Sequence, residues 1–340
     1  MTNRTIDIHT HILTEEMLRL LGKEGLELAP KLKHIDSDNA ILEIGGLTQD
    51  PYYRGGWDID RRLEDMNANG VNMQLLSPGV QTFFYNREPK LARALARLQN
   101  EQIASFCLKY PKRFMGLASV PLQDPAAAAE ELEYAIRVLN LRGAQIGSHV
   151  EGRNLDDPGV EQFWAKAAAL KAFILIHPHQ PAAADRLRSY YFRNFIGLTL
   201  ETTIAACSLV FGGLIERYPD LRICLCHAGG FVPYQSGRFD HGWNVRPEAK
   251  VKLQGTPHES FKRLFYDTIT HARGPLEFLI NEMTSGQVLL GSDYPFDMGN
   301  MNCVSSVNQT SLEDRDRAAI LGETAAALLA APVEQLINQG

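Results

Sequence analysis

A regular alternation of short apolar runs with helical segments is the feature that most constrains how this chain can fold. Most of the runs are nearly continuous in apolar residues, as expected for parallel strands that are buried on both faces. They cover residues 5–9, 73–77, 115–120, 143–149, 173–177, 222–227, 264–268 and 288–293. Eight strands, each followed by helical sequence, predict an α/β fold of the (β/α)8 barrel (TIM barrel) type. No GxGxxG motif follows the first run, which argues against a dinucleotide-binding sheet.

The segments between the runs carry the periodicity and the end signals of helices. Asp124 stands at an N-cap position before Pro125, and Gly70 and Pro111 follow segments of helical pattern. The predicted helices cover residues 58–69, 90–109, 125–140, 161–170, 202–217, 275–283, 312–320 and 324–337.

Residues 13–57 interrupt this alternation. They are rich in charged residues, Gly and Pro, so we expect a small insertion after strand one that caps the barrel mouth, with a short hairpin, and not an independent domain. An α/β barrel takes about 250 residues as one unit. The 340 residues therefore predict a single (β/α)8 barrel over residues 1–340, with 13–57 as a cap within it.

Composition excludes several other classes of protein. The net charge of −6 argues against a nucleic-acid partner, which usually calls for a clustered basic surface. No run reaches about 18 apolar residues, so we expect no membrane span, and the first residues do not resemble a secretory signal. The five cysteines are odd in number and scattered, which favours free thiols in a reducing, cytoplasmic setting.

Residues able to bind a metal follow several of the predicted strands. Run one contains His9 and leads into His11, run five ends at His177, run six ends at His227, and run eight ends at Asp293. The carboxyl ends of the strands form the active-site face of such a barrel. These side chains are therefore expected to meet at one rim.

The residue types and their spacing favour a single divalent ion. His9 and His11 are two residues apart on a strand, so their side chains point the same way and can bind one ion together. His177 and Asp293 would add ligands, while Asp293 pairing with a histidine or orienting water stays open. Imidazole and carboxylate suit Zn²⁺, the expected ion, with Mn²⁺ as an alternative. His227 is then free for acid–base catalysis, in which Asp293 could also take part.

Longer motifs resemble a known family. The HxH motif, the later histidines and the aspartate resemble the amidohydrolase superfamily. IDIHTHI, GAQIGSHV, ILIHPH, the block from ETTIAAC to CHAGG, and LLGSDYPF are similar to the 2-amino-3-carboxymuconate-6-semialdehyde decarboxylase family. The similarity extends from about residue 6 to residue 329.

The resemblance implies a metal held by His9, His11, His177 and Asp293, with His227 activating water or delivering a proton. The implied reaction is the non-oxidative loss of CO₂ from an aromatic or muconate-semialdehyde-type carboxylic acid. The family also uses two arginines for substrate carboxylates, one of them lent by the partner in a homodimer. Arg238 matches the lent arginine.

Three departures keep the reaction open. Residues 177–180 read HPHQ where the family usually has HPWD, the histidine at 227 is followed by AGG, and the second arginine has only Arg54 as a candidate. We expect His179, Phe296 and Arg54 to contact the substrate, and Phe83, Phe84 and Tyr85 either to wall it or simply to pack. A hydrolase or hydratase acting on a lactone, an amide or a C–C bond is the alternative function.

Overall fold

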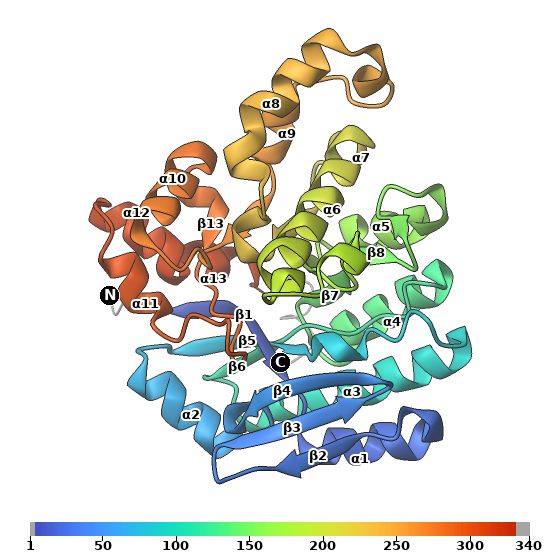
Figure 1. Ribbon diagram of the computed structural model, residues 1–340. Coiled ribbons are helices and arrows are strands. Elements are labelled where there is room, and N and C mark those ends of the chain that lie inside the picture. Colours follow the sequence, from blue (N-terminus) through green and yellow to red (C-terminus); the bar gives the residue numbers. More distant parts are fainter. Residues whose placement is uncertain (1–3, 331–340) are drawn as a thin grey trace, which may run out of the picture.

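The computed structural model describes residues 4–330, and its parallel strands fall on the eight predicted runs (Figure 1). They are β1 (Ile6–Ile12), β5 (Met73–Pro78), β6 (Phe114–Gly116), β7 (Gly143–Gly147), β10 (Phe173–His177), β11 (Arg222–Leu225), β12 (Phe265–Asp267) and β13 (Val288–Leu289). Their side chains are almost all buried, as the continuous apolar runs predicted. The α/β class is therefore confirmed.

The strands form two parallel sheets whose edges meet. One sheet has the order β1-β5-β6 and the other β13-β12-β11-β10-β7. Ala118 bridges Ala144 next to β6 and β7. On the other side, the N–H of Ile8 donates to the carbonyl of Leu290 at 2.9 Å. Within each sheet the neighbouring strands follow one another in the sequence, as in other parallel α/β folds.

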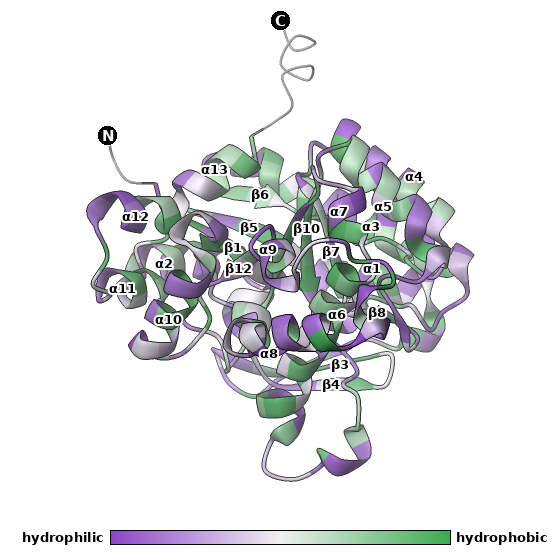
Figure 2. Ribbon diagram, turned by 90° about the horizontal axis from the view of Figure 1, so that it is seen from above, coloured by the Kyte–Doolittle hydropathy of each residue, from purple (hydrophilic) through white to green (hydrophobic). Residues whose placement is uncertain are grey.

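Helices follow the strands largely where the sequence predicts them. They are α2 (Ile59–Ala68), α3 (Pro89–Lys109), α4 (Pro125–Arg137), α5 (Glu161–Ala169), α6 (Thr199–Phe211), α7 (Leu214–Arg217), α10 (Arg273–Met283), α12 (Asp314–Ala318) and α13 (Thr324–Leu328). Asp124 caps α4, accepting the N–H of Ala127, as expected. In Figure 2, the hydrophobic residues concentrate on the central strands and the hydrophilic ones on the outer faces of the helices.

Two predicted helices differ from the structure. The helix expected over 202–217 is divided into α6 and α7 because Gly213 adopts φ +70°, and a Cβ there would lie 2.8 Å from the carbonyl of Lys252. Of the helix expected over 324–337, the described part is α13, and residues 331–337 lie outside the described residues.

The segment 13–57 holds more structure than the short hairpin we expected. It contains α1 (Glu15–Glu24) and an antiparallel sheet of β2 (Lys31–His34), β3 (Asn39–Ile44) and β4 (Leu47–Tyr53). Alternate residues of β3 (Ala40, Leu42 and Ile44) are buried, which gives this sheet an apolar face. In Figure 1 the sheet and α1 form a separate layer below the parallel strands.

One buried arginine joins this segment to β1. The guanidinium of Arg62 is fully buried and donates to the carbonyls of Gly55 and His11 and to the side chain of Gln74. The end of the 13–57 segment is thereby fixed to β1 and β5.

Three further helices of the described chain had no counterpart in the prediction, among them α11 (Cys303–Asn308). α8 (Val232–Val245) and α9 (Pro257–Phe261) extend away from the strands at the top of Figure 1. Both contain proline, and α8 also contains two glycines, so its helical pattern is weak in the sequence.

Residues 193–211 form a helix that is long and apolar enough to cross a membrane by length and composition alone. Its mean hydropathy is 1.4, and half of it is buried inside the protein. A core helix has the same properties, so this is weak support for a membrane span.

Candidate metal centre and active site

Four predicted ligands converge at the carboxyl ends of β1 and β10 and in the loop after β13. His9, His11, His177 and Asp293 are buried, and one ligand atom of each lies within 4.8 Å of the others. Asp293 Oδ1 lies 3.2 Å from His9 Nε2, 3.0 Å from His11 Nε2 and 3.7 Å from His177 Nε2. The structure therefore brings together the whole ligand set that the sequence suggested.

The outer nitrogens of two of these rings have acceptors that fix their tautomers. His11 Nδ1 lies 3.2 Å from the carbonyl of Pro78, and His177 Nδ1 lies 2.9 Å from the carbonyl of Pro178. A carbonyl only accepts, so each Nδ1 carries the hydrogen and each Nε2 presents a lone pair. Burial lowers the pKa of His11 and lowers the pKa of His177 to about 3, which keeps both rings neutral.

These lone pairs face other electron-rich atoms. His9 Nε2 and His11 Nε2 are 3.1 Å apart, and both lie close to the Asp293 carboxylate. His177 Nε2 is buried and has no hydrogen-bond partner among residues 4–330. Three imidazole nitrogens and one carboxylate oxygen thus converge. They repel one another unless a cation lies between them, so the donor set fits a divalent metal.

Asp293 is suited to remain ionised at this position. Burial alone raises the pKa of its carboxyl, but the surrounding imidazoles of His9, His11, His177 and His227 outweigh burial and hold the pKa well below its usual range. The site therefore contains a permanent negative charge for a bound cation.

A second carboxylate, which the sequence analysis missed, orients His9. Asp267 Oδ2 lies 2.7 Å from His9 Nδ1, and the carboxylate also accepts the backbone N–H groups of His227, Ala228 and Ile269. Histidine ligands commonly donate their outer N–H to a carboxylate that fixes the ring. Asp267 ends β12, just as Asp293 follows β13. A search for polar residues at the carboxyl ends of the strands would therefore have found it.

His227 stands beside the four ligands and outside their closest group. Its Nε2 lies 3.4 Å from Asp293 Oδ2, and its buried Nδ1 has no hydrogen-bond partner in the described chain. The residue has φ +54°, a left-handed conformation held by the bonds from its own N–H and that of Ala228 to Asp267. This places an imidazole nitrogen next to the predicted metal position.

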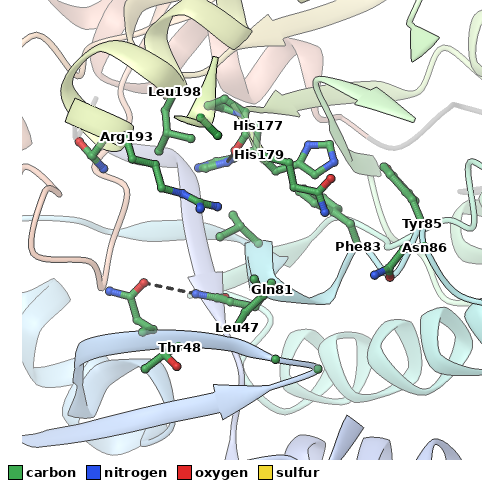
Figure 3. A pocket seen from close by; sticks show the side chains of 18 of the residues that line it. Leu47, Thr48, Gln81, Phe83, Tyr85, Asn86, His177, His179, Arg193 and Leu198 are labelled. Carbon is green, nitrogen blue, oxygen red and sulfur yellow. Dashed lines mark hydrogen bonds between the residues drawn. The ribbon is translucent and has the colours of Figure 1, made fainter. Parts of the chain in front are cut away.

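A cavity of about 780 Å³ opens on the same side (Figure 3). Its walls come from the turn between β3 and β4, the loop after β5, residues 177–180 after β10 and the segment 184–198. His177 is a ligand candidate that also lines the cavity, which connects the metal centre to the space for a substrate.

The predicted substrate-binding residues lie in different places. His179 lines the cavity, and Phe296 packs beside the centre with its ring 5.0 Å from that of His11. Arg54 pairs with Asp58 at 2.8 Å and is not among the cavity residues. Arg238 is exposed on α8, also outside the cavity. The structure thus brings His179 and Phe296 to the site and leaves the two arginines away from it.

The aromatic loop after β5 packs together and also lines the cavity. Phe83, Phe84 and Tyr85 are buried and line the cavity, while the rings of Phe83 and Tyr85 also stack at 5.5 Å. His149, which follows β7, stacks on His179 at 4.3 Å and is not itself a cavity residue.

Comparisons with known proteins show the family to which the chain belongs. The family model described as amidohydrolase matches residues 6–330. A 2-amino-3-carboxymuconate-6-semialdehyde decarboxylase of Dictyostelium discoideum is 37% identical over 297 residues, which cover 87% of this chain and 83% of the relative.

Solved structures of decarboxylases have the same fold. The 5-carboxyvanillate decarboxylase of Sphingomonas paucimobilis superposes with a TM-score of 0.82 at 25% identity, covering 97% of this chain and all of the other. A dihydroxybenzoic acid decarboxylase of Polaromonas sp. has a TM-score of 0.80 at 25% identity, covering 98% and 99% of the two chains. That structure contains manganese and the inhibitor 2-nitroresorcinol.

Proposed function

The chain belongs to the amidohydrolase family and is one of its metal-dependent decarboxylases, and from this premise we propose which residues carry out the reaction. We propose that His9, His11, His177 and Asp293 hold one divalent ion and that His227 is the acid–base catalyst. The observation that carries the proposal is the convergence of three histidine nitrogens on the Asp293 carboxylate. The substrate is an aromatic or similarly unsaturated carboxylic acid.

The ion supplies positive charge that stabilises the negative charge of the substrate as the bond to its carboxylate breaks. In non-oxidative decarboxylation the electron pair of that C–C bond stays on the carbon, CO₂ leaves, and the carbon takes up a proton. His227 is the residue placed to deliver this proton, because its ring stands at the metal centre next to Asp293. Asp293 Oδ2 keeps the His227 ring oriented, while Asp293 Oδ1 faces the other three histidines.

We propose Zn²⁺ as the resident ion, since histidine nitrogens and carboxylate oxygens are both common zinc ligands. The manganese in the Polaromonas relative makes Mn²⁺ the competing ion. Metal analysis of the purified protein, followed by activity after reloading with each ion separately, decides between them. Higher activity with Mn²⁺ than with Zn²⁺ would overturn the zinc assignment.

The hydrolase or hydratase alternative is not favoured by the relatives, which are decarboxylases. The test uses acids that carry ¹³C in the carboxyl group, chosen after the names of the relatives: 2-amino-3-carboxymuconate 6-semialdehyde, 5-carboxyvanillate and dihydroxybenzoate. Release of labelled CO₂ by the metal-loaded protein is expected for at least one of them. Turnover of lactones or amides without any labelled CO₂ would replace this proposal with the hydrolase.

We also propose a homodimer in which Arg238 reaches the site of the partner. Arg238 is exposed on α8, and the same helix exposes Tyr234, which is 79% accessible, just after Phe231. Large exposed aromatic groups on a projecting helix are typical of an interface between subunits. Arg238→Ala is expected to weaken carboxylate binding. Mixed dimers of Arg238→Ala and His227→Ala should regain activity, and no recovery would exclude action across the interface.

Three further assignments rest on the same reasoning. We infer that the eight strands close into one (β/α)8 barrel, since the two sheets are bonded at both pairs of edges. We infer that residues 13–57 cap this single domain, because the turn between β3 and β4 lines the cavity. A cytoplasmic location is supported by the five free cysteines.

A further inference from the structure

Asp7 is a buried carboxylate that the proposed reaction does not use. It lies on β1, two residues before His9, and it is fully buried. Among residues 4–330, its hydrogen-bond donors are the N–H and hydroxyl of Ser292, the N–H of His9 and the side-chain amide of Gln74. Glu131, buried to the same extent, is instead paired with Arg97 at 2.7 Å. A buried carboxylate whose donors are all neutral is costly to the folded state, so stability alone does not account for Asp7.

The first backbone group that Asp7 holds belongs to His9. The register of β1 against β5 shifts between Asp7 and Thr10, and His9 lies inside this irregularity. Its N–H donates to Asp7 Oδ1 at 3.3 Å. A shift of this kind interrupts the ladder of hydrogen bonds and redirects a side chain, and it often occurs beside active sites. Asp7 therefore accepts an N–H group at the point where β1 departs from regular pairing.

The second residue that Asp7 holds is Ser292, which directly precedes Asp293. The N–H of Ser292 donates to Asp7 Oδ1 at 3.0 Å, and its hydroxyl donates to Asp7 Oδ2 at 2.5 Å. The same hydroxyl accepts the N–H of Tyr294 at 3.2 Å. Asp293, between these two residues, has φ +61°, a left-handed conformation that is uncommon outside glycine and depends on support from the surrounding structure. The bonds of Ser292 supply that support on both sides of it.

The two irregular positions are also bonded to each other. The N–H of Asp293 donates to the carbonyl of His9 at 2.8 Å, while Asp293 Oδ1 lies 3.2 Å from His9 Nε2. A shift of either backbone segment therefore moves one of these side-chain atoms relative to the other. Asp293 Oδ2 also lies 3.4 Å from the ring of His227, so the same shift would reach that residue.

We propose that Asp7 is a positioning residue of the metal centre, which holds His9 and Asp293 in the irregular backbone conformations from which they face one ion. The inference rests on the proposed function, because it takes both residues as metal ligands. Asp7 is not among the residues that line the cavity, so it acts through the backbone of His9 and through Ser292.

Asp7→Asn and Ser292→Ala test the proposal, with the visible spectrum of bound Co²⁺ as the main measurement. Co²⁺ replaces the resident ion in the purified protein, and its absorption reports the geometry of its ligands. Both variants should shift this spectrum and lower metal affinity about 10- to 100-fold, as measured by competition with a chelator. The double variant should lose little more than the stronger single variant, because both changes break the same contact.

Two controls separate positioning from general stability. Ser292→Thr keeps the hydroxyl and should retain the spectrum and the affinity. Ser285→Ala removes another bond from a serine hydroxyl to an aspartate, Asp316, at 2.7 Å and at the opposite end of β13. It should also leave both measurements unchanged. A Co²⁺ spectrum that is unaltered in Ser292→Ala would overturn the proposal, whatever the variant does to the unfolding temperature.

Failure of this inference differs from failure of the proposed function. If the unaltered protein binds Co²⁺ and neither Asp7→Asn nor Ser292→Ala changes its spectrum, the proposed ligands stand and the positioning role falls. If the unaltered protein binds no stoichiometric Co²⁺, or if His9→Ala keeps the spectrum, the proposed ligand set falls and the positioning role falls with it.

Discussion

The metal centre and the cavity beside it satisfy their polar groups in opposite ways. At the centre, the outer nitrogens of His9, His11 and His177 are bonded to Asp267 or to backbone carbonyls, and the side chains are almost fully buried. In the cavity, the side chains of His179 and Arg193 have no hydrogen-bond partner among residues 4–330. The rings at the centre are thus oriented by folding itself, whereas these two cavity side chains keep polar groups that the described protein does not satisfy.

This difference predicts two kinds of variant. A change at the centre should affect metal retention or turnover for every substrate, because the geometry of the ligands is shared by all reactions at the site. A change in the cavity should alter the ranking of substrates and leave the metal in place. The following substitutions test this division, in order of decreasing effect.

His9→Ala should lose the metal and the decarboxylase activity together. The variant loses the Nε2 that faces both His11 and Asp293. Loss of a residue that only orients a metal ligand can lower activity about 100-fold, so loss of His9 itself should lower activity by more than that. Elemental analysis and CO₂ release measure the two effects. His34→Ala, at an exposed histidine paired with Glu15, should retain both. Full metal content in His9→Ala would show that the ion binds elsewhere.

His227→Ala should retain the metal and lose turnover. The ring lies beside the ligands but outside their group, so kcat should fall by about 100- to 10,000-fold, as for the loss of an acid–base catalyst. Simultaneous metal analysis is essential, since a variant that also lost the ion would make His227 a ligand.

Asp267→Asn should weaken metal binding without abolishing it. The amide keeps the shape of the side chain but loses a carboxylate oxygen that accepts from His9 Nδ1, and metal affinity should fall by about 10- to 100-fold. Competition with a chelator measures this affinity, and added metal should restore much of the activity. The exposed Asp185→Asn is the control. Unchanged affinity would contradict an orienting role.

Gly147→Ala should have the smallest effect and should act on the cavity alone. A Cβ at this position would lie 2.5 Å from Cε1 of His179 and 3.0 Å from Cε2 of Tyr85, so both rings must shift. Crowding of this kind costs about 1–3 kcal/mol, and we expect a severalfold rise in KM with unchanged metal content. Gly286→Ala, where a Cβ meets nothing within 4 Å, should leave KM unaltered.

The strands and the ligand set were predictable because each depends on a local signal. A parallel strand buried on both faces reads as a continuous apolar run, and the first polar residue after it faces the active-site rim. His9, His177 and Asp293 followed from that rule. Asp267 ends β12 and was missed because the predicted run continued past it to residue 268.

The cavity was less predictable because its walls come from segments that have no common local pattern. Nothing in the sequence around Arg193 indicates that residues 184–198 fold over the end of β10. The sheet of β2, β3 and β4 was underestimated for a similar reason, since its buried face is covered by other parts of the chain. Long-range packing decided both features.

The buried guanidinium of Arg62 has a consequence for changing the substrate range of this enzyme. It attaches the carbonyl of Gly55 to that of His11, so the last part of the 13–57 segment shares its anchor with a proposed metal ligand. The turn at Gly45 and Gly46 lies between β3 and β4 of the same segment and lines the cavity. Arg62 does not bond to this turn. Directed libraries built at the turn should therefore yield folded, metalated enzymes with new preferences, while libraries built near Gly55 should mostly yield inactive protein.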